Sequence, residues 1–408
     1  MTITACIEDT RLPAGKRAEE LPPLITRPLL LRFVSIIGSS ASFYLPLSVV
    51  PLYAKSAGAD ASAGFATGVL LLTTVGVELL TPRLVARTGY RLALSLGLVC
   101  LGLPALALLA PPDLAVLVAV SAVLGAGFAV VTVAGGTLTA SLIPAQRRGE
   151  GLALTGVVSG VPALACLPLG VWVSARWGFA PVFVATAAAA LLALTAVPYL
   201  PDRKVADRKA GGHGAATSSA AHGILTALAN ASLTRPAALF SASTMAAGVL
   251  VTFLPLAIAQ RSAAVVTFAL FAQPAAATLS RLAAGRFGDR HGHTSLLYPG
   301  IGLAAAGMAA IAATGTPALV IGGAAVFGAG FGLLQNATLA LMYAQTGRDG
   351  YDAVSALWNA AYDAGMGVGA IGMGLVAGSF GYPVTFLVTA AVVLAALFLA
   401  GRKQGKTG

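Results

Sequence analysis

The sequence predicts an all-α membrane protein of twelve transmembrane helices, arranged as two pseudo-symmetric bundles of six helices. Three observations lead to this prediction. The first is composition: 57% of the 408 residues are hydrophobic, only 10% are charged, and the mean hydropathy is +0.87. Soluble domains carry roughly 25% charged residues, so most of this surface must face lipid. The other two are a series of long apolar stretches and an internal repeat.

A transmembrane helix needs about 20 predominantly apolar residues. Twelve stretches meet this requirement, six in each half of the chain, at 29–53, 62–82, 90–110, 114–140, 151–175, 180–198, 236–260, 264–284, 295–314, 317–345, 353–377 and 382–401. We therefore expect an N-terminal tail at 1–28, a first bundle at 29–198, a polar linker at 199–235, a second bundle at 236–401 and a C-terminal tail at 402–408.

The distribution of Lys and Arg predicts the orientation. With a cytoplasmic N-terminus, only Lys55, Arg176 and Arg261 of the 25 basic residues fall outside, and the other 22 fall inside. Basic residues concentrate in cytoplasmic loops of membrane proteins, so this split favours an even number of spans. We expect a multi-pass protein of the cell inner membrane with both termini and the linker in the cytoplasm. The same distribution, in short runs between apolar stretches, argues against nucleic acid as a partner.

The two halves repeat, mostly at one constant spacing. Gly-Ala-Gly-Phe at 125–128 recurs 203 residues later at 328–331, and Gly178 and Phe183 recur at the same spacing as Gly381 and Phe386. The starts of the halves also match, at a spacing of 208 residues, with Arg27-Pro28 corresponding to Arg235-Pro236. Six spans in each repeat give both halves the same orientation in the membrane. Parallel repeats of this kind place the substrate between the halves, near the middle of the bilayer.

The segment Gly-Arg-Phe-Gly-Asp-Arg-His-Gly-His at 285–293 lies between two predicted spans of the second half. It resembles the loop signature of the major facilitator superfamily, Gly-x-x-x-Asp-Arg-x-Gly. The resemblance covers nearly the whole chain and implies a transporter that works by alternating access. It also implies that Gly285, Asp289, Arg290 and Gly292 form a cytoplasmic latch between the bundles.

The equivalent loop of the first half keeps Arg87 and Gly89 but has Ala86 where the signature has Asp. We expect this latch either to be weakened or to be rebuilt from Glu78 and Asp352. Glu78 and Arg281 stand 203 residues apart, at equivalent depths in their spans. Their opposite charges suggest a gate or latch pairing.

Ionisable residues inside a membrane are costly and usually functional. Asp363 lies about ten residues into its span, close to the expected midplane, with Asn359 and Tyr362 on or beside its face. We predict a proton-titrating or substrate-binding carboxylate, and a structural hydrogen-bonding role is the alternative. For Arg32, near the start of the first span, we expect the side chain to extend to the membrane interface, and the mouth of the cavity is the alternative. Other polar residues predicted to line the site, or to hydrogen-bond between helices, are Gln273, Gln335, Asn336 and Tyr44.

Resemblance to the drug- and sugar-efflux branches of the superfamily implies proton-coupled export of a small organic molecule, and a role in drug resistance. Ser121 stands where exchangers of this kind often carry Arg, which weakens that implication. Metabolite uptake by symport or uniport is the alternative, and a membrane sensor or enzyme is a more distant one. We expect no catalytic residues and no cofactor, with the proton gradient as the energy source. We also expect no metal, because His291 and His293 form a pair without a third ligand. The protein is expected to act as a monomer in the bilayer. The sequence does not identify the substrate, the direction or the coupling ion.

Overall fold

The computed structural model describes residues 23–56, 63–111, 113–144, 147–202, 230–346 and 351–400. Most of the predicted tails and of the linker at 199–235 lie outside these ranges. Within them the chain is almost entirely helical, which confirms the predicted all-α class.

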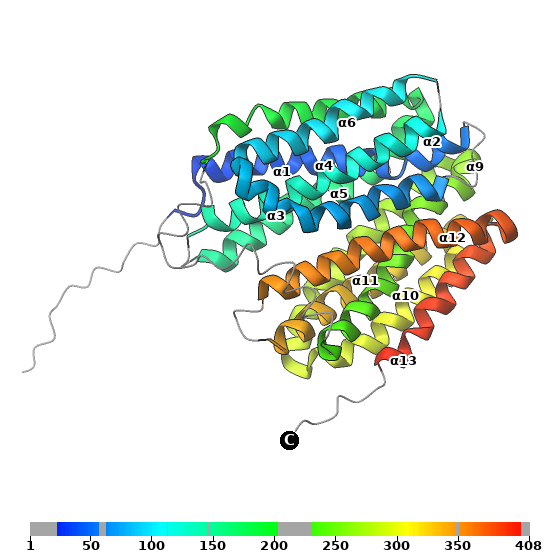
Figure 1. Ribbon diagram of the computed structural model, residues 1–408. Helices are drawn as coiled ribbons and strands as arrows, with labels where there is room; N and C mark the ends of the chain where they lie inside the picture. The colour runs from blue at the N-terminus through cyan, green and yellow to red at the C-terminus, as the bar shows by residue number, and fades with distance from the viewer. Residues whose placement is uncertain are drawn as a thin grey trace, which may run out of the picture.

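The helices of the first half are α1 (Arg27–Leu47), α2 (Val50–Ser56), α3 (Ala63–Gly102), η2 (Leu103–Leu109), α4 (Leu114–Leu142), α5 (Arg148–Trp177), α6 (Ala180–Leu194) and η4 (Val197–Tyr199). Those of the second half are α9 (Ala231–His291), η5 (His293–Leu296), α10 (Leu297–Ile311), α11 (Pro317–Ala344), α12 (Tyr351–Ala395) and α13 (Leu397–Ala400). Figure 1 shows the first half, which runs from blue through cyan to the green of α6, lying beside the second half, which runs from green through yellow to red.

The described residues contain ten helices that are long and apolar enough to cross a membrane, where the sequence predicted twelve spans. Two of the ten are unusually long, at 46 residues for Gly64–Leu109 and 42 for Val354–Ala395. Each contains one glycine with non-helical dihedral angles, Gly89 in the first and Gly381 in the second. The difference in number arises at these two glycines, because each long run includes two of the predicted spans.

Four glycines in the described residues have positive φ angles: Gly89, Gly178, Gly292 and Gly381, all between 80° and 84°. This backbone region strongly favours glycine, which has no Cβ to clash with the following carbonyl. Gly89 pairs with Gly292, and Gly178 with Gly381, at the spacing of the sequence repeat. The repeat therefore extends to the points where the chain turns between helices.

The repeat also extends to helix packing. A Cβ on Gly125 of α4 would collide with the backbone of Leu70 in α3, and one on Gly328 of α11 would collide with the backbone of Gln273 in α9. The two contacts are related by the same spacing as the sequence repeat. Small residues that let backbones approach closely are the usual basis of helix association in membranes.

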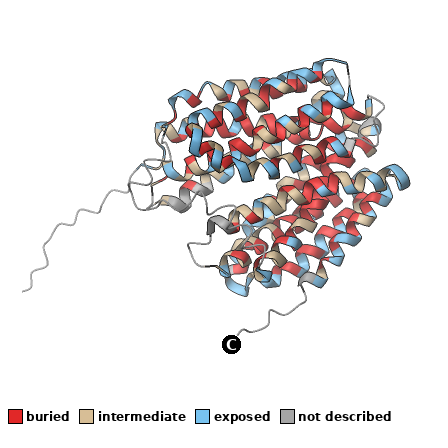
Figure 2. Cartoon of the chain, viewed as in Figure 1, coloured by how far each residue is buried: buried red, intermediate tan, exposed pale blue. Residues whose placement is uncertain are grey.

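The outer faces of the helices carry large apolar side chains. Leu192, Leu375, Phe380 and Phe398 are between 68% and 82% exposed. Figure 2 shows this pattern, with exposed residues on the periphery and buried residues between the helices. A protein surface of this kind fits contact with lipid. Together with the long apolar helices, it shows a multi-pass membrane protein.

Candidate functional site

The two halves meet where α3 crosses α12. The backbone of Gly68 packs against the side chain of Ile371, and Gly367 packs against Leu71 and Leu72. Higher numbers on one helix face lower numbers on the other, so the helices are antiparallel. One turn further along, Asp363 of α12 is therefore level with residues 75–78 of α3.

Asp363 is buried at this crossing, with only 7% of its surface exposed. Among the described residues, its carboxylate makes no hydrogen bond or ion pair. It lies close enough to Glu78 of α3 and Tyr44 of α1 for electrostatic interaction. The predicted site residue thus sits between the halves, next to residues that the first half contributes.

Tyr362 and Arg281 complete this group. Tyr362 is half-buried and interacts electrostatically with Tyr44, Asp363 and Arg281 of α9. The Arg281 side chain is exposed. We name the set of Tyr44, Glu78, Arg281, Tyr362 and Asp363 the central group. Four helices from both halves contribute to it, and every member is a sequence-predicted site or latch residue.

A wall of aromatic rings adjoins the central group. The rings of Phe240 and Trp358 stack with centroids 4.3 Å apart. The Tyr362 ring lies 5.9 Å from Phe240, 6.3 Å from Phe331 and 6.3 Å from Trp358. Helices α9, α11 and α12 hold these rings, so the second half gives the site an aromatic side.

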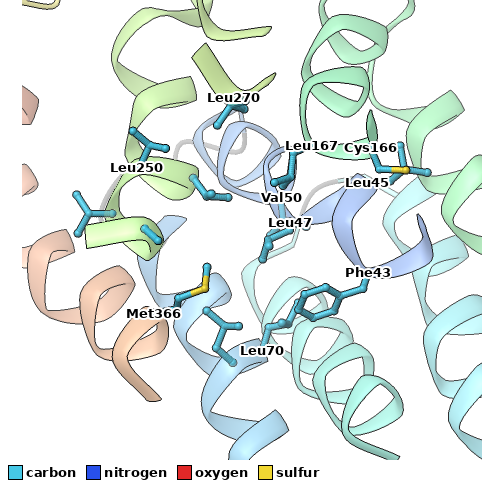
Figure 3. Close-up of a cluster of buried hydrophobic side chains, with 14 of the residues drawn as sticks. Phe43, Leu45, Leu47, Val50, Leu70, Cys166, Leu167, Leu250, Leu270 and Met366 are labelled. Atoms are coloured by element: carbon cyan, nitrogen blue, oxygen red, sulfur yellow. The ribbon is translucent and has the colours of Figure 1, made fainter. Parts of the chain in front are cut away.

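On one side of the central group the halves are joined by tightly packed apolar side chains. Figure 3 shows Leu47, Val50 and Leu70 of the first half near Leu250, Leu270 and Met366 of the second. All six are no more than 5% exposed. Met366 follows Asp363 by three residues, so this packing lies directly beside the site. We call this side the α2 end.

Lys55 adds polar contacts between the halves at the α2 end. Its ammonium nitrogen donates to the Leu256 carbonyl of α9 at 3.4 Å and lies 5.7 Å from the centre of the Tyr382 ring of α12. The sequence identified Lys55 only as a basic residue on the minority side of the membrane. Its contacts depend on residues about 200 and 330 positions away, which no local pattern reveals.

The remaining predicted site residues lie apart from the described contacts of the central group. Gln273 is 7% exposed, and its backbone packs under Gly328. Gln335 and Asn336 are half-buried, and the Asn336 Oδ1 atom has no hydrogen-bond partner among the described residues. Asn359, one turn before Asp363, is exposed.

The latch residues lie at the opposite end of the helices from Lys55. Gly292 ends α9 with a φ of 84°, while Arg87 and Arg290 are exposed. Gly285 is half-buried near the Asn336 amide. The side chains of Asp289 and Asp352 lie outside the described residues, so the predicted latch contacts of Asp289 stay a prediction.

A carboxylate that the sequence did not single out reaches the loop of the first half. Asp202 accepts a hydrogen bond from the Arg91 backbone N–H at 3.5 Å and lies beside Gly89. The Arg91 side chain donates to the Leu200 carbonyl at 2.6 Å. Asp202 thus supplies an acidic group close to the loop in which Ala86 replaces the signature Asp.

The prediction for Arg32 is wrong, because its side chain does not extend to the membrane interface. It is 3% exposed and turns inward between α1 and α4. Its Nε donates to the Gly135 carbonyl and the Thr139 hydroxyl, both at 3.2 Å. Its Nη1 donates to Ser35 at 2.8 Å and its Nη2 to the Val131 carbonyl at 3.5 Å. Hydrogen bonding to carbonyls and hydroxyls offsets part of the cost of burying this charge.

No group of three or more His, Cys, Asp or Glu side chains that could hold a metal ion occurs within the described part of the chain. The chemistry available at the crossing is therefore that of two carboxylates, two phenols, one guanidinium and a set of aromatic rings. Such groups can bind and exchange protons and organic molecules.

The fold has close counterparts among solved structures. The nucleoside transporter NupG aligns with a TM-score of 0.74 and 14% identity, covering 93% of this chain and 100% of its own. A POT family transporter in complex with 5-aminolevulinic acid aligns with a TM-score of 0.72 and 13% identity, covering 91% and 95%. At these identities the likeness concerns the fold alone. No curated protein sequence matches the chain.

The family model of the Major Facilitator Superfamily matches residues 32–262 and 237–406, two overlapping segments that together cover nearly the whole chain. The paired contacts of the two halves agree with this match. The chain belongs to the Major Facilitator Superfamily of membrane transporters.

Proposed function

We propose that this protein is a twelve-span secondary transporter of the inner membrane that exports a small organic molecule in exchange for protons. It acts as a monomer, without a cofactor, with both termini in the cytoplasm. The proposal rests on the position of Asp363. Its carboxylate is buried between the two halves beside Glu78 and has no hydrogen-bond partner among the described residues.

The two long helical runs support the proposed twelve crossings. The longer run has 46 residues. At the rise of an α-helix, a straight helix of that length would span about 69 Å, more than twice the thickness of a bilayer core, which is roughly 30 Å. The positive φ of Gly89 and Gly381 breaks each long run near a predicted loop. Counting each run as two crossings turns ten helices into twelve, six in each half.

In an alternating-access mechanism, the packing at the α2 end would close one side of the transporter. The apolar contacts and Lys55 hold the halves together on that side, which is the external side in the orientation predicted from the basic residues. The central group is then reached from the cytoplasm in this state. Rocking of the halves would open the α2 end and expose Asp363 to external protons, and a proton on Asp363 would displace the substrate.

Uptake of a metabolite is the second candidate, because the solved structures with this fold include a nucleoside transporter and a POT family transporter. The fold does not distinguish the two directions. A sensor or enzyme built on the same scaffold is a third and weaker alternative, for which no site was found in the described residues.

The test uses everted membrane vesicles whose lumen is acidified by respiration, with a dye that reports luminal pH. A panel of dyes, nucleosides, 5-aminolevulinic acid and short peptides is added in turn. An exporter that exchanges protons releases luminal protons when its substrate is added, and Asp363→Asn abolishes this release.

The matched control is Asp113→Asn, which changes an exposed carboxylate that caps α4 by accepting the Val116 N–H at 3.0 Å. Asn caps helices about as well as Asp, so this variant should behave as wild type. Proton release that is equal in Asp363→Asn and wild type would remove Asp363 from the mechanism. Substrate accumulation in whole cells that an uncoupler abolishes would favour uptake over export.

A further inference from the structure

The charge of the central group suggests which class of substrate it accepts. It contains two carboxylates, Asp363 and Glu78, and one guanidinium, Arg281. The Cys166 thiol interacts with Tyr44. This thiol and the phenols of Tyr44 and Tyr362 are neutral in their ordinary forms at neutral pH. With both carboxylates ionised, the group therefore carries one net negative charge.

Other basic residues do not cancel this charge. Arg83 and Arg286 lie five residues beyond Glu78 and Arg281 on their helices, which turns them about 140° away. Both side chains are exposed.

Arg32 lies twelve residues before Tyr44 on α1, which is about 18 Å along the helix. Its guanidinium is bonded to α4. Lys55 is bonded to the Leu256 carbonyl at the α2 end.

The negative charge lies at a buried position. Asp363 is 7% exposed, yet its carboxylate has no hydrogen bond or ion pair in the described part of the chain. An ionised carboxylate at such a position is costly unless a proton or a cation accompanies it. On the α3 side, level with Asp363, a Cβ on Gly76 would meet no atom within 4 Å, so the crossing leaves open space there.

The surroundings favour an organic cation over a metal ion. Ca²⁺ and Mg²⁺ require six or more oxygen ligands. In the described residues, no group of three or more His, Cys, Asp or Glu side chains is placed so that it could hold a metal ion. Aromatic rings, in contrast, attract organic cations through their negative faces. The Tyr362 ring adjoins both Asp363 and the stacked rings of Phe240 and Trp358.

We propose that the central group binds a monovalent organic cation with apolar or aromatic substituents. The positive charge of this cation lies near Asp363 and Glu78. Its apolar part packs against the rings of Tyr362, Trp358 and Phe240. This inference rests on the proposed function and names its substrate class. A single cation or a single proton neutralises the group, so the two compete and one proton enters for each cation that leaves. No covalent bond changes in this exchange.

The experiment measures binding to the purified, detergent-solubilised protein by equilibrium dialysis. Its probes are tetraphenylphosphonium and tetraphenylborate, which have nearly the same size and shape but opposite charge. We expect the cation to bind and the anion not to bind. We also expect cation binding to be tighter at about pH 8 than at about pH 6, and to release protons into a weakly buffered solution.

Substitutions of the two carboxylates test whether they supply the negative charge that binds the cation. Asp363→Asn and Glu78→Gln each should weaken tetraphenylphosphonium binding by at least about tenfold, as expected for loss of one close charge pair. Asp363→Glu should keep most of the affinity, and Asp113→Asn should match wild type. Monodisperse elution of each variant in gel filtration shows that it is folded.

Equal binding of both probes, or unchanged cation binding in a folded Asp363→Asn or Glu78→Gln variant, would overturn the inference. This outcome is distinguishable from failure of the proposed function. Cation binding without substrate-induced proton release in vesicles would refute the export mechanism alone. Proton release with a neutral or anionic compound, and no cation binding, would refute the substrate class alone.

Discussion

The contact between Arg32 and Gly135 yields a sharp prediction for stability. A Cβ on Gly135 would collide with the Arg32 guanidinium, so Gly135→Ala must displace it. The displacement disrupts the hydrogen bonds to the carbonyls of Gly135 and Val131, at 3.2 Å and 3.5 Å. Hydrogen bonds to charged groups contribute about 1.5 kcal/mol or more each, which gives a loss of roughly 3 kcal/mol.

The substitution also has a favourable effect, because Ala is a better helix former than Gly by up to about 1 kcal/mol. Subtracting this gain leaves a net destabilisation of roughly 2 kcal/mol. The neighbouring Gly136 offers the control, since a Cβ there would meet no atom within 4 Å. Gly136→Ala should therefore leave stability unchanged or raise it slightly.

The assay is reversible unfolding of the purified protein in mixed micelles by increasing fractions of sodium dodecyl sulfate, followed by tryptophan fluorescence. Gly135→Ala should unfold at a lower detergent fraction than both wild type and Gly136→Ala. If the two alanine variants unfold at the same fraction, the Arg32 side chain is not held against α4 as described. In that case the argument for a buried, bonded guanidinium is wrong.

Two further predictions concern the halves and the crossings. Cysteines introduced as Leu71→Cys and Gly367→Cys in a background without other cysteines should cross-link on oxidation and block transport until reduced. A Cβ on Gly367 would lie 3.3 Å from the Leu71 Cβ, which is close to the spacing of Cβ atoms in disulfides. The pair Gly76→Cys and Ala370→Cys should not cross-link, because Ala370 lies against Gly64, which is twelve residues, about 18 Å, from Gly76 along α3. In the proposed topology, reporter proteins fused after Gly178 or Gly381 should be active only if they function outside the cytoplasm. Cytoplasmic activity at either fusion would contradict twelve crossings.

Much of the architecture was accessible from the sequence because it depends on local properties. The length and hydropathy of a stretch decide whether it can cross a bilayer, and these are read from about 20 consecutive residues. The internal repeat and the segment at 285–293 indicated the family, which the family model confirms. The cost of an acidic residue within an apolar span singled out Asp363.

The partners of the buried polar residues were decided by tertiary structure alone. Arg32 bonds to residues about 100 positions away, and Asp363 lies beside Glu78, 285 positions away. The acidic residue beside the first-half loop is Asp202 rather than the missing signature residue. Hydropathy determines that a helix spans the membrane, but the rotation and neighbours of that helix depend on which small residues let two backbones meet. In this chain those contacts place Arg32 against α4 and bring α3 against α12 at Asp363.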